Sequence, residues 1–577
     1  MKRLPSLKIG LIFTLLFLTA CVPPRPQTNQ KAELSIHDIQ GCTHISPYVN
    51  QQVEDINGIV TYKAYQGFYM QEEQPDARDC SSEGIYVHVG SYPDVYPGDR
   101  VSVTGRVLEY TAGREDEYNL PITEIDPDSI QIVSSGNDIP AAVVIGQRGR
   151  SLPNSVIDDD ETTQFDPDID GLDFFESLES MLIQVESGIV VGPRNSYNEV
   201  AVISPGTLDA RQMSAAGALL ATMEDHNPER ILLNMNQSNT ELVNLGARLV
   251  KPVMGIMDYS YGNFKINTIG RVYFQNTRTE IGPVEMSDGL LSIASFNVEN
   301  LSRNDPESRF RSIARNIVQD LNSPDVLTLH EILDDSGVED DGEVSAHKTL
   351  TKLVQAITSA GGPDYTIIDN EPQNNADGGI DGGNIRTVVL FREDRQISLV
   401  GNPVRIGENL SIFRATRKPL VCIFSRGEEQ FLVIAAHLTS RGADSPLFGS
   451  KQPLVRPEEG KRNQQARYIN DYVRDYSNNH PNTRVIVAGD MNDDPWSNTI
   501  SLLEGNTLTD LARQLPETER YSYILDGNAI QLDYILVSEA AAGGKDIFAI
   551  VHLNSQLDYV NKTSDHDAVI AGINLGE

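Results

Sequence analysis

The stretch VIVAGDMNDDPWSN, residues 485–498, joins a short apolar run to a cluster of acidic and amide side chains. Residues 485–488 predict the end of a buried strand, because consecutive apolar residues bounded by glycine are typical of a sheet interior. Gly489 is expected to turn the backbone, so that the polar residues emerge from the end of the strand. Carboxylates gathered there indicate a metal site, and an acidic turn that merely caps a strand is the alternative.

The sequence around this stretch alternates predicted strands with predicted helices from about residue 288 onward. Strands are predicted in LLSIASFNVEN, DVLTLHEI, NIRTVVLF, EQFLVIAAHLTS and RVIVAGDMND. The segment PESRFRSIARNIVQDLNS predicts an amphipathic helix, because Phe310, Ile313, Ile317 and Leu321 recur at helical spacing. Such alternation predicts an α/β domain built from layered sheets.

The chain before this domain is rich in short predicted strands. Residues 35–140 alternate apolar and polar positions between Gly, Pro, Asn and Asp, which favours a small barrel of the OB-like type. Its aromatic cluster either stacks nucleic-acid bases or forms the core and rim of the barrel: Tyr62, Tyr65, Phe68 and Tyr69. Residues 141–285 predict a second β-rich domain. The acidic run DDDETTQFDPDIDGLDF within it fits either a calcium loop or a solvated linker, because its ligand spacing is irregular.

The first 21 residues have the features of an export signal. Lys2 and Arg3 precede an apolar run, residues 9–20, that is too short to span a bilayer. The sequence LTAC, which ends at Cys21, resembles a bacterial lipobox and implies cleavage before Cys21 and a lipid on its sulfur; an ordinary signal peptide is the alternative. We therefore expect an exported protein with a tether over residues 22–34. It would be lipid-anchored at the cell envelope, with the outer membrane or cell surface favoured, or else secreted.

Cysteine usage and charge further constrain the function. Cys42 and Cys80 share the N-terminal region, so an oxidising compartment would favour a disulfide between them. The formal net charge of −36 argues against passive binding of nucleic acid, which normally requires a basic surface. A divalent cation can offset such charge, so metal-assisted catalysis remains compatible with it. One local basic patch is predicted, formed by Lys451, Arg456, Lys461, Arg462 and Arg467.

Polar residues recur where the predicted strands of the C-terminal half finish. Because strand ends converge on one edge of a sheet, these residues are expected to share one cleft. Taken singly, several of them would be structural ion pairs or satisfied core polar groups. The series comprises Asn297 in FNVEN, Glu331 in LHEI, Arg386 in GGNIRTVVLF, His437 in AAHLTSRG, Asp490 and Asn492 in GDMND, Asp533 in QLDYILVS, and Ser564, Asp565 and His566 in SDHDAV.

The order SFNVEN, HEI, AHLTSRG, GDMND, LDYILVS and SDH resembles the deoxyribonuclease-like endonuclease/exonuclease/phosphatase superfamily over residues 286–577. DGGNIRTVVLF and DFFESLESMLIQV are similar to segments of its secreted bacterial extracellular nucleases. The resemblance implies a multidomain protein. Its C-terminal domain would be a four-layered α/β sandwich, two packed mixed sheets flanked by helices, after all-β OB-like barrel domains.

The resemblance also implies a metal ion and a general base. Glu331 and Asp565, with Asn297 nearby, would bind Mg²⁺, with Mn²⁺ or Ca²⁺ as alternatives. His566 would accept a proton from the attacking water, and Asp533 would hold the other ring nitrogen.

The remaining residues would contact the water or the substrate. Asp490 would orient the water, and Asn492 and Arg386 would bind the substrate phosphate. His437 would stabilise the transition state or protonate the leaving oxygen. One departure from the family pattern is His330, which stands where Gln is usual and is itself a candidate to approach the cation.

The expected activity is metal-dependent hydrolysis of phosphodiester bonds in DNA, by in-line attack of a His-activated water, and RNA is left open as an alternative substrate. No obligate protein partner is expected. Superfamily members also include phosphatases of inositol phosphates and phosphodiesterases of sphingomyelin, so both activities are alternatives. A non-catalytic surface-binding lipoprotein is an alternative of another class, and it predicts degraded catalytic residues.

Overall fold

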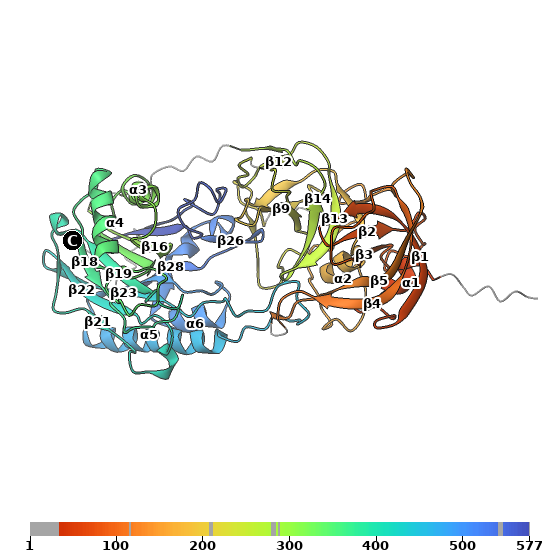
Figure 1. Cartoon of the computed structure of the whole chain (residues 1–577). Helices are drawn as coiled ribbons and strands as arrows, with labels where there is room; N and C mark the ends of the chain where they lie inside the picture. Colours follow the sequence, from red (N-terminus) through yellow and green to blue (C-terminus); the bar gives the residue numbers. More distant parts are fainter. Residues whose placement is uncertain are drawn as a thin grey trace, which may run out of the picture.

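The computed structural model describes residues 34–114, 117–206, 212–239, 241–277, 284, 286, 289–539 and 546–575. Figure 1 shows the N-terminal strands at one end of the molecule, the layered C-terminal domain at the other, and the middle sheet between them. The predicted signal peptide, the lipid attachment at Cys21 and nearly all of the tether lie outside the described residues. None of the helices in the described ranges is long and apolar enough to cross a membrane.

Five N-terminal strands close into a barrel in the order β1-β2-β3-β5-β4, with β1 paired to both β2 and β4. Phe68 and Tyr69 of the aromatic cluster are buried, whereas Tyr65 is exposed. Cys42 and Cys80 form the predicted disulfide, which ties the segment after α1 to the loop before β3. The elements are α1 Ile36–Gln40, β1 Gln52–Lys63, β2 Gly67–Gln71, β3 Gly84–His88, β4 Arg100–Thr111 and β5 Pro121–Ser134.

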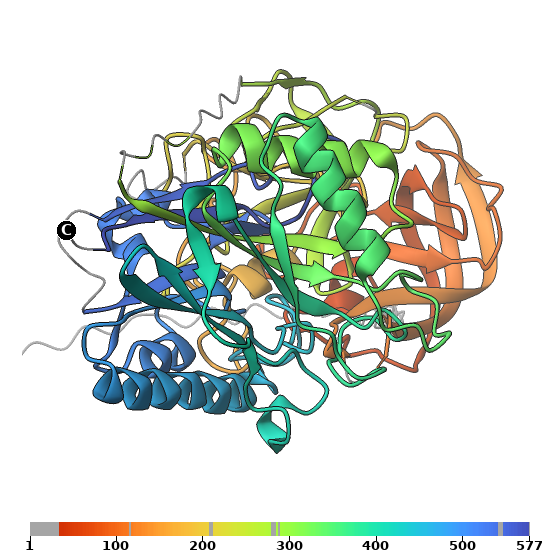
Figure 2. The same cartoon turned by 90° about the vertical axis from the view of Figure 1, so that its left-hand side faces the viewer.

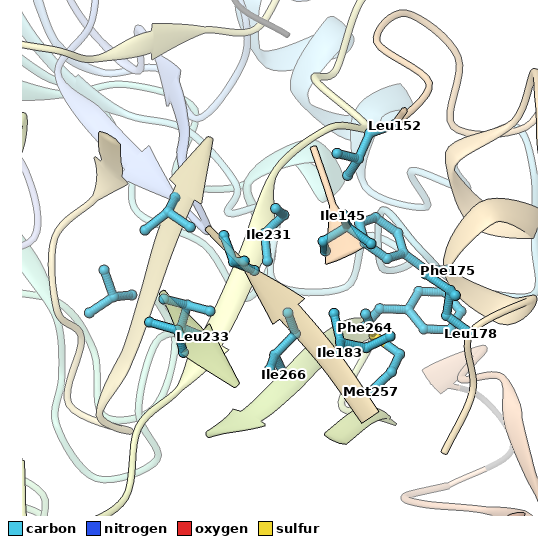
Figure 3. Packing of buried hydrophobic residues seen from close by; sticks show 14 of the residues in the cluster. Ile145, Leu152, Phe175, Leu178, Ile183, Ile231, Leu233, Met257, Phe264 and Ile266 are labelled. Atoms are coloured by element: carbon cyan, nitrogen blue, oxygen red, sulfur yellow. The ribbon is translucent and has the colours of Figure 1, made fainter. Parts of the chain in front are cut away.

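The middle of the chain forms a nine-stranded sheet in the order β15-β12-β8-β9-β11-β14-β13-β7-β6. Figure 3 shows its core, in which Phe175 and Leu178 pack toward Ile183, Met257 and Phe264. The elements are β6 Val143–Ile145, α2 Gly171–Glu176, β7 Leu182–Val185, β8 Ile189–Gly192, β9 Glu199–Ile203, β11 Ile231–Asn234, β12 Arg248–Leu249, β13 Val253–Ser260, β14 Asn263–Thr268 and β15 Phe274–Gln275.

Two mixed sheets form the centre of the C-terminal domain. The first has the order β18-β19-β17-β16-β30-β29, and the second has the order β20-β22-β23-β24-β28-β25 with β21 beside β22. The first comprises β16 Leu291–Leu301, β17 Val326–Ile332, β18 Thr366–Asp369, β19 Arg386–Phe391, β29 Ile547–Val551 and β30 Ala568–Ile573. The second comprises β20 Ile397–Leu399, β21 Val404–Arg405, β22 Leu420–Arg426, β23 Glu429–His437, β24 Arg484–Asp490, β25 Leu508–Asp510 and β28 Asp533–Ser538.

Helices cover the outer faces of these two sheets, as the alternating sequence pattern predicts. Figure 2 shows α3 and α4 in green on one side and α5 in blue on the other. Phe310, Ile313 and Ile317 are fully buried against the first sheet, and each contributes about 1.5 to 3 kcal/mol relative to an exposed position. A separate apolar core fills the space between the sheets. The helices are α3 Glu307–Arg315, α4 His347–Ser359, α5 Glu459–Asn479 and α6 Asn498–Glu504.

The middle and C-terminal domains are joined by backbone pairing, charge and apolar packing. β10 Leu219–Leu220 lies parallel to β27 Asn528–Ile530, which also pairs with β26 Tyr523–Leu525. Arg194 donates from Nε and Nη2 to the two carboxylate oxygens of Asp558, at 2.8 and 3.0 Å. Phe448 of the C-terminal domain lies in the core of the middle domain. These contacts fix one face of the middle domain beside the ends of the C-terminal strands.

Candidate active site

Sheet register brings three of the predicted residues side by side. His437 ends β23, Asp490 ends β24 and Asp533 begins β28, and the pairing places His437 opposite Asp490 and Asp490 opposite Asp533. The other sheet contributes Asn297 from β16 and Glu331 from β17. The strand-end argument is therefore sound for these residues, because the two sheets present them at one edge.

His566 and Asp533 form a closely held pair at the centre of this group. His566 Nδ1 lies 2.8 Å from Asp533 Oδ2, which also accepts a 2.7 Å hydrogen bond from the Ser522 hydroxyl. The opposite ring nitrogen, Nε2, lies 3.8 Å from Asp490 Oδ2. Burial disfavours the charged imidazole, but the Asp533, Asp490 and Asp565 carboxylates outweigh it and raise the pKa of His566 well above its usual value. The geometry leaves Nε2 facing the other carboxylates.

Asn297 bridges two carboxylates of the group, those of half-buried Glu331 and buried Asp490. Its Nδ2 donates to Glu331 Oε1 at 3.0 Å and to Asp490 Oδ2 at 3.1 Å. Burial raises the pKa of Asp490 to about 6, with a further contribution from Asp533. Burial likewise raises the pKa of Glu331, and the charges of Asp565 and Asp490 add to the shift.

This donor set fits a divalent cation. Carboxylate oxygens are ligands that Mg²⁺ and Ca²⁺ prefer, and a cation would relieve the repulsion that disfavours the charged carboxylates. The Asn297 amide oxygen is not free for this, because it accepts from the Glu299 amide at 2.9 Å. Glu331, Asp490 and His437 each place one ligand atom within 4.8 Å of the others. Glu331 also has a left-handed backbone with φ of 61°, a conformation that costs a non-glycine residue about 1 to 3 kcal/mol. Such strain is typical of residues that are held in place for function.

His437 is buried beside Asp490, with Nε2 at 3.4 Å from Asp490 Oδ2. Burial lowers its pKa well below the usual value, and the nearby charge of Arg417 contributes in the same direction. The ring is therefore neutral near pH 7. A neutral imidazole at this position can donate one hydrogen bond to a phosphate oxygen.

Gly489 does not turn the chain, in contrast to the sequence prediction, because β24 continues through Asp490. Glycine is required there because an added Cβ would lie 1.7 Å from the Ala436 carbonyl oxygen, and the φ of 156° is unfavourable for other residues. The chain turns later, at Asn492, whose φ is 52°. Asn492 Nδ2 donates to the Leu438 carbonyl at 3.2 Å, so the amide lies at the edge of the group.

Arg386 does not join the group, and its predicted role as a phosphate clamp is not supported. Its side chain is fully buried, and its guanidinium donates to Asp369 at 3.1 Å and to the carbonyl oxygens of Asn384 and Val344. Arg417 is instead the guanidinium whose charge interacts with Glu331 and Asp490. The strand-end pattern overlooked Arg417 because it precedes a strand, β22, rather than following one.

His330 and the predicted basic patch also have structural partners. The ring nitrogens of His330 lie 3.0 Å from Ser295 Oγ and 3.2 Å from Thr387 Oγ1, so both nitrogens of this buried residue are already engaged by hydroxyl groups. Arg462 donates to Asp493 at 2.9 Å, and Arg456 donates to Asp494 at 3.2 Å. Two of the five predicted basic residues are therefore paired with the last two aspartates of GDMNDD.

A cleft of about 830 Å³ opens beside the group and is shared by two domains. The C-terminal domain contributes Asp565, Lys562 and Tyr523, whose ring centroid lies 4.9 Å from that of His566. The middle domain contributes Tyr197 and Tyr261, which are 80% and 74% exposed. Sequence reasoning missed these two tyrosines, because they lie more than 250 residues before the motifs that they approach.

Residues 294–566 match the family model described as "Endonuclease/Exonuclease/phosphatase family", and residues 144–275 match a "Domain of unknown function (DUF8508)". No curated protein matches the chain. Humanized D. rerio TDP2 is a similar solved structure, at 20% identity over 50% of this chain and 100% of that chain, with a TM-score of 0.36. The human nocturnin catalytic domain with bound sulfate anion is another, at 17% identity over 49% of this chain and 95% of that chain, with a TM-score of 0.32.

The family match begins in β16 and ends at His566. It therefore spans the strands that carry the whole candidate group, from Asn297 to His566. The C-terminal half of the chain is a domain of the endonuclease/exonuclease/phosphatase family.

Proposed function

We propose that the protein is a metal-dependent nuclease that hydrolyses phosphodiester bonds of DNA, with RNA as a second substrate. Domains of this family are generally hydrolases of phosphodiester bonds and depend on divalent metal ions. The observation that carries the proposal is the paired His566 and Asp533 next to the carboxylates of Glu331 and Asp490. A non-catalytic binding protein would have no need to retain this arrangement.

Glu331 and Asp565 would hold the cation, with Asn297 and Asp490 beside them. When bound, Mg²⁺ would offset negative charge on the phosphate as the transition state forms. Mn²⁺ and Ca²⁺ share its preference for oxygen ligands and remain alternatives.

The side chains of the chain itself supply the proton transfer and the positioning. His566 would accept the proton of the attacking water at Nε2, while Asp533 holds Nδ1 and fixes the tautomer. Asp490, close to Nε2, would orient that water. His437 and Asn492 would donate hydrogen bonds to phosphate oxygens, and donors held in place before reaction stabilise developing charge well. Arg417, whose Nη2 donates to the Leu438 carbonyl at 2.6 Å, would contribute its positive charge to the group.

The shared cleft favours an extended nucleic acid over a small phosphomonoester. Tyr197 and Tyr261 project exposed rings into it, and exposed aromatic rings suit the stacking of unpaired bases. Lys562, from the C-terminal domain, adds positive charge to the cleft.

We also propose that the N-terminal barrel is an OB-like accessory module, since its strand order gives a closed five-stranded barrel.

The experiment that tests this proposal is cleavage of plasmid DNA and of RNA by the protein without residues 1–21, in Mg²⁺ and in EDTA. Sphingomyelin and inositol phosphates are assayed in parallel. Metal-dependent cleavage of the plasmid is the expected result. Comparing the cleavage of closed circular DNA with that of linear DNA then distinguishes endonuclease from exonuclease action. Hydrolysis of a lipid or inositol ester alone would leave the chemistry intact and contradict the proposed substrate.

Replacing Tyr197 and Tyr261 together by alanine is expected to lower kcat/KM for a long single-stranded oligonucleotide by at least about 30-fold, because each stacked base contributes about 1 to 3 kcal/mol and two bases are affected. Turnover of bis(4-nitrophenyl) phosphate, which has no bases, should stay near the unmodified level. Tyr110→Ala, a change at an exposed tyrosine on the barrel, is the matched control. Equal losses on both substrates would argue against stacking.

We further propose that the mature protein is exported and attached to the cell envelope through a lipid on Cys21. The LTAC sequence and the short apolar run before it support this proposal. Mass spectrometry of the mature N-terminus tests it, and an unmodified mature N-terminus would refute the lipid.

A further inference from the structure

The middle domain contains an acidic loop outside the candidate active site. The loop leads into α2, with Asp170 as the N-cap residue and Asp173 in the first turn. Asp166, Asp170 and Asp173 each place one carboxylate oxygen within 4.8 Å of the others. Three carboxylates this close repel one another strongly unless a positive charge lies between them.

Asp170 distinguishes this loop from an ordinary acidic turn. Its side chain is 0% exposed, and among the described residues neither of its carboxylate oxygens has a donor in hydrogen-bonding geometry. One oxygen of Asp166 is likewise buried without such a donor. Burying an unpaired carboxylate is strongly unfavourable, so these oxygens are expected to have a partner that is not a protein group.

We propose that Asp166, Asp170 and Asp173 bind a divalent cation of the calcium type. Ca²⁺ takes six to eight oxygen ligands in a flexible geometry, so backbone carbonyls or water can complete a shell begun by three aspartates. Residues 166–171 read D-x-D-x-D-G, as at the start of an EF-hand loop, but the clustered carboxylates stand at positions 1, 5 and 8 of that pattern, and position 12 is Ser177 instead of Glu. The site is therefore a calcium loop of a different form.

The loop also contacts the N-terminal region of the chain. His44, two residues after Cys42 of the disulfide, places Nε2 at 2.7 Å from Asp173 Oδ1. The His44 ring also contacts Phe165 of the loop, with centroids 5.2 Å apart. His44 offsets charge on Asp173 but leaves the Asp170 oxygens unpaired. The ion would therefore act on the loop and α2, away from the catalytic group.

The test measures binding of Ca²⁺ in protein that carries Glu331→Gln, which weakens the other metal site. After removal of metal with EDTA, Ca²⁺ alone is titrated by calorimetry, and Tm is measured with and without it. We expect Asp170→Asn in this background to lose one equivalent of bound Ca²⁺ and most of the rise in Tm. Asp159→Asn, at an exposed carboxylate of the same loop, should keep both.

The sign of the stability change separates an ion site from a merely repulsive cluster. Without an ion, Asp170→Asn removes a buried charge and should raise Tm in EDTA and in Ca²⁺ alike. With an ion, the variant is less stable than its parent when Ca²⁺ is present. Unchanged Ca²⁺ binding in Asp170→Asn would overturn the proposal. If that variant does not fold, Asp166→Asn provides the same comparison. Neither readout depends on nuclease activity.

Discussion

Replacing His566 by alanine is expected to lower kcat on plasmid DNA by about 10²- to 10⁴-fold, the range that general base catalysis supplies. His566 is the imidazole whose Nδ1 is held by a buried carboxylate, at 2.8 Å, while Nε2 lies 3.8 Å from Asp490 Oδ2. Because the base acts on the water and not on the substrate, KM should change much less than kcat. Single-turnover measurements in saturating Mg²⁺ would separate the two.

A matched control lies close by in the same domain. His552 also pairs with a buried aspartate, Asp567, at 2.9 Å, and its ring stacks on Tyr521. Its pairing resembles that of His566, yet no candidate ligand is among its partners. His552→Ala should therefore reduce stability and leave kcat of the folded enzyme nearly unchanged. A comparable loss of kcat in both variants would indicate that alanine at His566 disturbs the fold and would contradict the assignment of the base.

The role of Asp533 can be read from the pH dependence of the same assay. His566 must be neutral to accept a proton, so activity rises with pH through the pKa of this residue. The Asp533 carboxylate raises that pKa by stabilising the imidazolium, and Asp533→Asn removes this charge. We expect the acid limb of kcat/KM to move to lower pH in Asp533→Asn, with a lower maximum because the tautomer is no longer fixed. If the acid limb does not move, the ionisation that produces it belongs to a group other than His566.

The sequence predicts the layers and most of the site, because these depend on local patterns. Apolar periodicity identifies α3 and β24, and a polar residue at a strand end identifies Asp490, Asp533 and His437. The strand-end rule works here because sheet register places these three on adjacent strands.

Predictions failed where a side chain's role depends on distant partners. Arg386 begins β19, opposite Ile332 at the end of the antiparallel strand β17 that carries Glu331, but its guanidinium is buried and donates to Asp369 on the neighbouring strand β18. Arg417 reaches the group from a loop before its strand, so no periodic signal marks it. Tyr197 and Tyr261 reach the cleft because the middle domain docks through Asp558. Such contacts are set by domain packing, which short sequence patterns do not encode.

Glu331→Gln is expected to lower activity by at least about 100-fold, because metal stabilisation of the transition state is worth several kcal/mol. The change keeps the size of the side chain and its hydrogen bond from Asn297, but it removes one charge from the proposed ligands. Wild-type protein should gain Tm when Mg²⁺ replaces EDTA, since a ligand that binds only the folded state stabilises it. Glu331→Gln should lose most of that gain.

The pH dependence of stability in EDTA is an independent test of the assignment of Glu331. Burial, with the charges of Asp565 and Asp490, raises the folded-state pKa of Glu331 above its unfolded value. Deprotonation of Glu331 therefore lowers the free energy of unfolding of the wild-type protein. The loss begins as the pH rises above the unfolded pKa of about 4.3 and is complete above the folded-state pKa. Glutamine does not titrate, so the Tm of Glu331→Gln relative to wild type should rise as pH increases through this window.

Asp510 provides the matched control for both measurements. Burial raises its pKa to about 6, as for Asp490, but it lies on β25 and bonds to Gln531 and the Ala512 amide. Asp510→Asn should show a similar rise in relative Tm with pH and keep the full response to Mg²⁺. If Glu331→Gln kept its Mg²⁺ response as well, Glu331 would be a buried carboxylate of the same structural kind as Asp510, and the cation would have to be held by other residues of the group.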